Sequence, residues 1–114
     1  MKHLATILVT VVILTAVLLP GSKIPDTSLP WIDKLVHFIL FTSWTVAIVN
    51  DFRLKWYMAL VAALLFALFT ELIQLPVEGR TFDFNDLIAD GAGVIFGLAN
   101  ADFIIRITRK LLRR

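Results

Sequence analysis

Six side chains able to take part in polar chemistry fall within twenty residues of an otherwise apolar sequence, in the stretch 71–97. They are Glu71, Gln74, Arg80, Asp83, Asp86 and Asp90. Carboxylates can act as general acids and bases, or as oxygen ligands for a hard divalent cation. A guanidinium suits bidentate recognition of phosphate or carboxylate. We therefore take this stretch as the first candidate for a functional site.

A second polar cluster lies earlier in the chain, at Asp33, Lys34 and His37. In a helix His37 shares a face with both neighbours, because it follows them at positions i+4 and i+3. Histidine can carry a proton or ligate a metal, and Lys34 with Arg80 would hold a phosphate-bearing or carboxylate-bearing head group. Two plainer readings stay open: Lys34 extends to the membrane interface, and His37 only makes a hydrogen bond between helices.

The acidic residues also have plainer readings. Asp83 and Asp86 open a predicted helix, where the helix dipole favours negative charge. Glu71 is different, because it falls in the last turns of a predicted helix, where the dipole disfavours an anion by a few tenths of a kcal/mol. A structural ion pair would offset this cost, with three candidate partners: Arg80, Lys34 and a protonated His37.

The composition indicates a membrane protein. The chain has 114 residues, of which 59% are hydrophobic, and a mean hydropathy of +0.86; soluble domains are about 45–50% apolar. The sequence has no cysteine, which excludes disulfides, thiol nucleophiles and thiolate metal sites. The net charge is only +2. The basic residues after position 105 adjoin an apolar segment, so we read them as a membrane flank and expect no nucleic-acid partner.

Four apolar segments predict a single all-α transmembrane domain over residues 1–114, a bundle of four helices. We expect these helices at about residues 4–19, 31–49, 56–75 and 83–105. The first is short for a span of roughly 20 residues, and its basic start also fits a signal peptide. We favour a retained helix, because no clear cleavage site follows it. Residues 20–30 carry three prolines and a glycine, which is typical of a loop.

The distribution of positive charge predicts the orientation. With four spans, one side holds eight basic residues, namely Lys2, Arg53, Lys55, Arg106, Arg109, Lys110, Arg113 and Arg114. The other side holds three, which are Lys23, Lys34 and Arg80. The side richer in Lys and Arg is normally cytoplasmic. We therefore expect both termini in the cytoplasm and both polar clusters at the outer face.

The two clusters are expected to meet in one pocket. Counting about 1.5 Å per helical residue, Glu71, His37 and Asp90 lie at similar depths on three different helices, below the same membrane face. A charged side chain at mid-bilayer costs about 2.5–3.5 kcal/mol on insertion scales. Isolated polar groups should therefore turn inward and satisfy one another. In the predicted helix 83–105, the glycines Gly93 and Gly97 are four residues apart, a spacing that permits close approach of another helix in lipid.

These motifs together resemble the VanZ-like membrane proteins, whose pattern is D-K-x-x-H, then E-x-x-Q, then R-x-x-D-x-x-D-x-x-x-N-x-x-G-x-x-x-G. The resemblance covers roughly residues 30–97. The matching positions are Asp33, Lys34, His37, Glu71, Gln74, Arg80, Asp83, Asp86, Gly93 and Gly97. Asp90 stands where the family usually has asparagine, which adds a negative charge to the site.

The resemblance implies a small multi-pass protein of the bacterial cytoplasmic membrane, from a family associated with resistance to the glycopeptide teicoplanin. We expect it to act on or bind a membrane lipid or a lipid-linked cell-envelope precursor. Under the enzyme hypothesis, the catalytic residues are Glu71, His37, Asp86 and Asp83, and the substrate-binding residues are Arg80, Lys34, Asp33, Gln74 and Asp90. A bound divalent cation stays an open alternative.

Two other functions remain open. The chain is alternatively a non-catalytic binding protein or partner subunit, in which the same cluster recognises a lipid head group or a drug. A path for ions or protons through Asp90, His37 and Glu71 is the weakest hypothesis, because the inner half of the bundle has almost no polar residues. Dimerisation through the glycine-bearing fourth helix is also open.

Overall fold

The computed structural model describes residues 3–18, 30–77 and 84–112, which form four α-helices. The helices are α1 (Leu4–Leu18), α2 (Pro30–Phe52), α3 (Trp56–Ile73) and α4 (Phe84–Leu112). The last three are long and apolar enough to cross a membrane, whereas α1, with 15 residues, is shorter. The predicted all-helical architecture is therefore confirmed, and three candidate spans are present among the described residues.

Two helices extend beyond their predicted ends. The polar residues Asn50 and Asp51 continue α2 instead of forming a turn, and α2 stops only before Arg53, whose φ is 52°. A left-handed residue after the last turn is a common way to end a helix. The basic residues Arg106, Arg109 and Lys110 continue α4. Positive charge in the last turns of a helix interacts favourably with its dipole.

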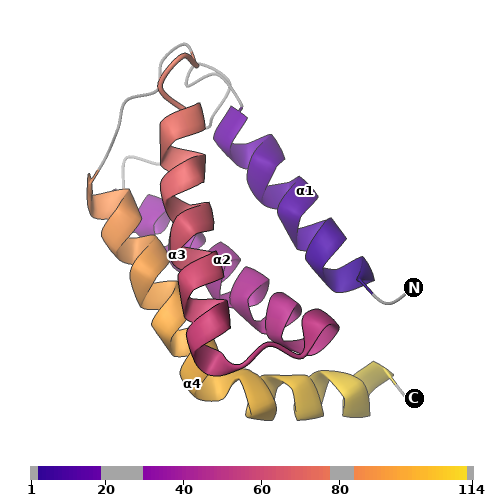
Figure 1. Cartoon of the computed structure of the whole chain (residues 1–114). Coiled ribbons are helices and arrows are strands. Elements are labelled where there is room, and N and C mark those ends of the chain that lie inside the picture. Colours follow the sequence, from indigo (N-terminus) through magenta and orange to yellow (C-terminus); the bar gives the residue numbers. More distant parts are fainter. Residues whose placement is uncertain (1–2, 19–29, 78–83, 113–114) are drawn as a thin grey trace.

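The helices α2 and α4 share the most extensive contact in the molecule, and α1 and α3 pack beside them. In Figure 1 the start of α1 and the end of α4 lie on the same side, at the lower right. The last turns of α4, coloured yellow, bend away from the rest of that helix and cross the bottom of the molecule (Figure 1).

The contact between α2 and α4 depends on two glycines of α4. A Cβ atom on Gly93 would lie 2.4 Å from the carbonyl oxygen of Phe38, and one on Gly97 would lie 3.0 Å from that of Thr42. In addition, the Thr42 hydroxyl donates a hydrogen bond of 3.0 Å to the carbonyl oxygen of Gly93. The predicted close approach at these glycines therefore occurs within the chain, between α2 and α4.

The interior is built from small and branched apolar residues. Ala59, Ala63 and Ala67 are buried at every fourth position along α3, which lets neighbouring helices approach it closely. Around this core, large apolar side chains such as Leu8 and Leu65 remain exposed, at 56% and 62%. Apolar surface on all sides is unfavourable in water and suits a helix bundle surrounded by lipid.

Side-chain hydrogen bonds connect three helices at the end of the molecule where α2 leads into α3. The carboxylate of Asp51 accepts hydrogen bonds from the backbone N–H and the hydroxyl of Thr6, at 2.9 and 2.8 Å. The backbone N–H groups in the first turn of a helix have no acceptor within that helix. Asp51 supplies the acceptor for the N–H of Thr6 in the first turn of α1. Arg109 in α4 donates to the amide oxygen of Asn50 at 2.9 Å. The ends of α1, α2 and α4 are thereby held together.

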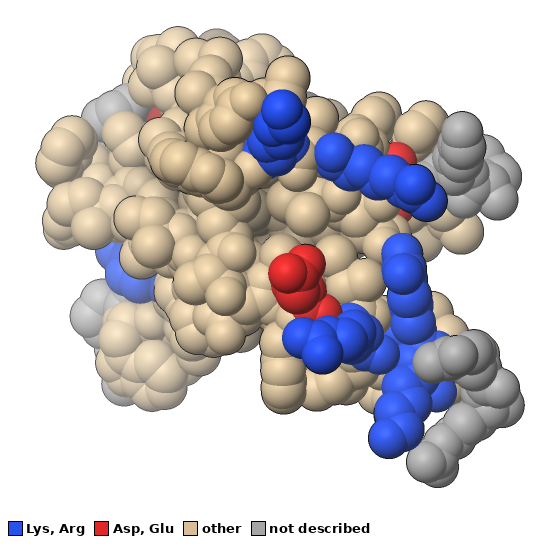
Figure 2. All heavy atoms as spheres, turned by 60° about the horizontal axis from the view of Figure 1, so that its bottom comes forward, with Lys and Arg blue, Asp and Glu red and all other residues tan. Residues whose placement is uncertain are grey.

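Positive charge collects at this same end. Figure 2 views the molecule from the bottom of Figure 1 and shows Lys and Arg side chains gathered over this face. The described basic residues of the α2–α3 connection and of the last turns of α4 are Arg53, Lys55, Arg106, Arg109 and Lys110. The described basic residues thus gather at this end, whereas Lys2, Lys23, Arg80, Arg113 and Arg114 lie outside the described residues.

Candidate functional site

The rim of the polar site is formed by the first turns of α2 and α4. The Lys34 ammonium in α2 donates to Asp86 Oδ1 in α4 and forms a longer ion pair, of 3.4 Å, with Asp33 Oδ2. Asp86 and Asp33 are both in the first turn of their helices, where the dipole favours a carboxylate. One ammonium therefore lies between two carboxylates from different helices.

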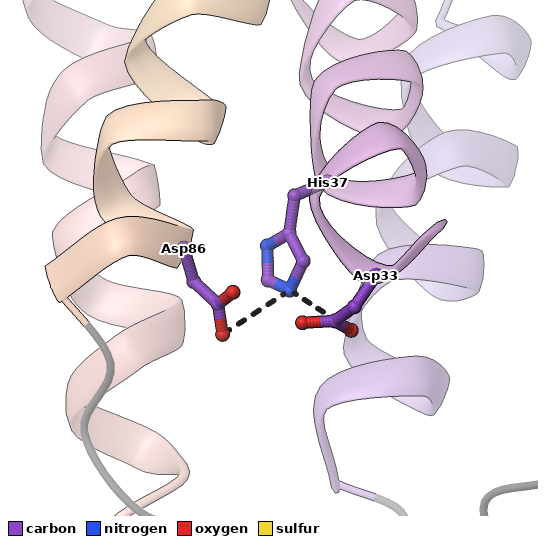
Figure 3. A group of neighbouring side chains, drawn as sticks. All are labelled: Asp33, His37 and Asp86. Carbon is purple, nitrogen blue, oxygen red and sulfur yellow. Dashed lines mark ion pairs between the residues drawn. The ribbon is translucent and has the colours of Figure 1, made fainter. Parts of the chain in front are cut away.

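His37 lies one turn deeper on α2 and connects the rim to the interior. Its Nε2 atom lies 3.6 Å from Asp86 Oδ2 and 4.0 Å from Asp33 Oδ1. Figure 3 marks both ion pairs with dashed lines. On the other side of the ring, Nδ1 lies 2.7 Å from Asp90 Oδ1, which is hydrogen-bond distance. Because Asp90 follows Asp86 by one helical turn, both carboxylates of α4 face the same imidazole.

Burial increases steeply along this set of residues. The side chain of Asp33 is 56% exposed and that of Lys34 31%, whereas Asp86 and His37 are at 10% and 11%, and Asp90 is fully buried. One carboxylate oxygen of Asp90, Oδ2, has no hydrogen-bond partner among the described residues. A buried carboxylate oxygen without a donor is costly, so this position is unfavourable for stability alone.

The helix α3 contributes two more polar residues to the same end of the bundle. Glu71 is completely buried, and its carboxylate belongs, with His37 and Asp90, to a group whose polar atoms lie within 4.8 Å of one another. Gln74 directly follows α3, which ends at Ile73 and not at the predicted residue 75, and it is 2% exposed. Since Gln74 follows Glu71 by three residues, both lie on the same face of the chain. Three helices thus supply buried polar groups to one site.

The structure brings together most of the residues that the sequence singles out. The described members are Asp33, Lys34, His37, Glu71, Asp86 and Asp90. Gln74 is buried immediately after α3, three residues from Glu71 in the sequence. Arg80 and Asp83, predicted as a substrate-binding and a catalytic residue, lie outside the described residues. The convergence of the polar clusters is therefore confirmed for the described part of the chain, whereas the individual catalytic and binding roles stay predictions.

Other polar contacts were missed by sequence reasoning. Thr42 bonds to the backbone of α4, and the indole N–H of Trp44 donates to the hydroxyl of Thr10 at 2.8 Å. Thr45 donates to the Phe41 carbonyl of its own helix. Hydroxyls at every few positions of an apolar segment are a signal for such bonds. These hydroxyls bond to backbone carbonyls or to a neighbouring helix and so serve helix packing.

The arrangement is suited to moving a proton. The imidazole of His37 lies between the exposed Asp33 and mostly buried Asp86 on one side and the fully buried Asp90 on the other, so it can accept a proton on one ring nitrogen and release one from the other. Lys34 holds Asp86 and Asp33 in place by charge-assisted hydrogen bonding, which is stronger than bonding between neutral groups. The site is therefore rigid at the rim and polar throughout its depth.

The described chain is all-helical, and three of its helices are apolar and long enough to cross a membrane. A polar site lies between these helices. These features define a helical membrane protein. The family model described as VanZ/LLP1 matches residues 3–106, and the chain belongs to this family. The match covers all the described residues of the site. No curated protein and no solved structure matches the chain.

Proposed function

We propose that this VanZ-family protein recognises a lipid-linked or cell-envelope substrate at an outward-facing site and acts on it by general acid–base chemistry. The observation that supports this most directly is the position of His37, between the rim carboxylates and buried Asp90. Such an imidazole takes a proton from one side and returns it on the other. A site at one end of the bundle also suits a substrate whose head group lies at the membrane surface.

The orientation is part of the proposal. A bundle of four spans in the bacterial cytoplasmic membrane, with both termini in the cytoplasm, puts the basic face of Figure 2 on the inner side. The site at the first turns of α2 and α4 then faces outward. We infer a role in envelope modification for this face, including a contribution to glycopeptide resistance.

Because the sequence has no cysteine, the orientation can be tested with single introduced cysteines. Trp31→Cys, at the site end of α2, should react with a membrane-impermeant maleimide in intact cells. Lys55→Cys should react only after the membrane is opened. Both side chains are exposed, so access depends on the side of the membrane. The reverse labelling pattern would place the site in the cytoplasm and end the proposal.

The reaction is tested with variants that keep side-chain shape. Chromosomal expression of His37→Gln, Glu71→Gln and Asp86→Asn is compared with wild type for envelope-lipid composition and for resistance to glycopeptides. General acid–base steps typically contribute about 100-fold to 10,000-fold in rate, so we expect each variant to abolish the phenotype. Asp102→Asn is the matched control for Asp86→Asn, because Asp102 is an exposed aspartate near the other end of α4.

The binding hypothesis gives a different result in the same experiment. A protein that only recognises a head group or drug would retain its phenotype in His37→Gln, which keeps a polar side chain, while still requiring the charged rim. Loss in Asp86→Asn with full function in His37→Gln would therefore contradict catalysis. Full function in all three variants would contradict any role for the site.

A further inference from the structure

We propose that His37, Glu71 and Asp90 bind a divalent metal ion of the zinc or manganese class in the interior of the bundle. One ligand comes from each of α2, α3 and α4. Their nitrogen and carboxylate oxygen atoms lie within 4.8 Å of one another. In a tetrahedral zinc site with bonds of about 2.1 Å, ligand atoms are about 3.4 Å apart. The observed group therefore needs only side-chain adjustments to close around a metal.

The burial of this group points to a cation. Glu71 and Asp90 are both 0% exposed, and Asp90 Oδ2 has no hydrogen-bond partner among the described residues. Two carboxylates so close together in an apolar interior repel one another. A divalent cation bound between them removes this repulsion and satisfies the remaining oxygen of Asp90.

The environment of His37 fits a metal ligand. When Nδ1 binds a metal, Nε2 carries the proton and faces the carboxylates of Asp86 and Asp33, at 3.6 and 4.0 Å. Metal-bound histidines usually direct their second ring nitrogen to a carboxylate, which orients the ring and increases its basicity. Metal binding replaces the proton between Nδ1 and Asp90 Oδ1: a neutral imidazole moves this proton to Nε2, whereas an imidazolium, already protonated at Nε2, releases it.

The ligand types indicate which metals fit. Imidazole favours zinc and other transition metals, whereas magnesium and calcium prefer sites made of oxygen alone. One histidine and two carboxylates leave at least one coordination position open, as in catalytic zinc sites. Metal binding does not depend on the substrate proposed above. If both proposals hold, the metal occupies Nδ1 of His37, so the carboxylates of the site carry out the proton transfer. The bound cation then adds to the positive charge of Lys34 in holding a phosphate-bearing head group.

A competing site shares the same histidine. Asp33, His37 and Asp86 form a second group of candidate ligands within the described residues, on the Nε2 side of the ring (Figure 3). Lys34 already binds both of these carboxylates, so a cation there must displace an ammonium. The inner group includes the buried Asp90 Oδ2, which has no donor among the described residues. These observations favour the inner group.

The test is metal binding to the full-length protein in detergent, with no substrate present. Zinc affinity and stoichiometry are measured by equilibrium dialysis against a chelator buffer, with magnesium as the comparison metal. We expect one zinc per chain. Glu71→Gln and Asp90→Asn should each weaken binding more than 100-fold, because they remove a metal-binding carboxylate. Asp33→Asn should weaken it by no more than about 10-fold to 100-fold, because Asp33 only faces the second ring nitrogen of His37.

A second measurement uses the wild-type ligand set, so it is decisive even if the variants do not fold. The protein is labelled with ¹⁵N-histidine and loaded with ¹¹³Cd as a zinc substitute. His3→Gln removes the second of the two histidines, which assigns the signal. Coupling of cadmium to Nδ1 of His37 is the expected result. Coupling to Nε2 would place the metal in the outer group, and the absence of stoichiometric binding would exclude a metal site; either result overturns the proposal. Because no substrate is present, neither bears on the envelope function.

Discussion

At the scale of single residues, His37 gives the site its character, because it is the residue that contacts both the rim and the interior. Nδ1 pairs with Asp90 at 2.7 Å, and Nε2 faces Asp86 at 3.6 Å. The acids alone would be a cluster of like charges. The imidazole makes them a connected set, in which a change on one side of the ring affects the hydrogen bonding on the other.

Lys34 should be the residue whose loss costs most stability at the rim. Lys34→Met leaves the carboxylate of Asp86, only 10% exposed, without its ammonium partner. Removing one member of a mostly buried ion pair leaves an uncompensated charge, and we expect a loss of about 2 kcal/mol after allowing for partial exposure. The free energy of unfolding is measured in mixed detergent–SDS micelles.

The double variant Lys34→Met/Asp86→Asn tests the reason for this loss. If the cost is an unpaired carboxylate, neutralising Asp86 should restore more than half of the lost stability. The control is Lys110→Met, on the exposed surface of the last turns of α4, which should change stability by less than about 0.5 kcal/mol. No recovery in the double variant would show that Lys34 acts through packing rather than charge.

At the scale of helices, the close contact between α2 and α4 positions the site. Asp33, Lys34 and His37 are on one helix, and Asp86 and Asp90 are on the other. The distances between these groups are short because Gly93 allows the backbone of α2 to approach α4 immediately below the site. Any increase in this separation would move Asp90 away from His37.

Gly93→Ala should therefore damage both stability and the site. The added Cβ would lie 2.4 Å from the carbonyl oxygen of Phe38, which is backbone and cannot move aside alone. We expect a loss of at least about 2 kcal/mol, within the range for overpacking, together with reduced metal binding. Gly91→Ala is the matched control, since nothing lies within 4 Å of its added Cβ. Alanine there should stabilise the helix by about 0.5–1 kcal/mol. Equal effects at the two glycines would contradict close packing.

The connection between α2 and α3 gives a second prediction at this scale. Arg53 has a φ of 52°, a conformation that side chains with a Cβ rarely adopt. Arg53→Gly should raise the free energy of unfolding by about 0.5–1 kcal/mol, because the relief of strain exceeds the entropy that glycine loses. Lys55→Gly in the same connection should lower it, since Lys55 has an ordinary φ of −67°. A loss of stability in both variants would show that Arg53 is not strained.

At the scale of the whole molecule, the two ends of the bundle have different chemistry. One end carries the acidic and imidazole groups of the site, and the other carries the basic residues and the hydrogen bonds that join α1, α2 and α4. The apolar zone between them is held by small residues and by hydroxyls bonded to backbone. This division fits one functional face and one anchoring face.

The bond between Arg109 and Asn50 should hold the last turns of α4 against the bundle. Arg109→Ala removes the hydrogen bond that its guanidinium donates to the amide oxygen of Asn50, worth about 1 kcal/mol, so amide hydrogen exchange over residues 106–112 should rise about fivefold. Arg106→Ala is the control, because Arg106 bonds only weakly, at 3.4 Å, to the Asp102 carbonyl of its own helix. Faster exchange in both variants alike would mean that the effect is not specific to the contact with α2.

Much of this molecule follows from the order of its residues. Long apolar segments require helices in lipid, because every backbone polar group must be satisfied within the segment. The positions of Asp33, His37, Glu71, Asp86 and Asp90 on these segments place their polar groups near one end. The predicted ends of two helices, at residues 49 and 105, were wrong, because α2 continues through Asn50 to Phe52 and α4 continues past Ile105 to Leu112. Polar residues there remain helical because tertiary partners, such as Thr6 for Asp51, satisfy their side chains.

The sequence by itself determined that the chain forms apolar helices and that these helices carry polar residues at particular positions. Both properties depend only on composition and on spacing along a helix. Which ring nitrogen of His37 faces which carboxylate was decided only by the tertiary structure. That choice depends on how closely α2 and α4 approach and how they are rotated about their axes. Approach and rotation are set by the contact of Gly93 with the Phe38 backbone, between residues far apart in the chain.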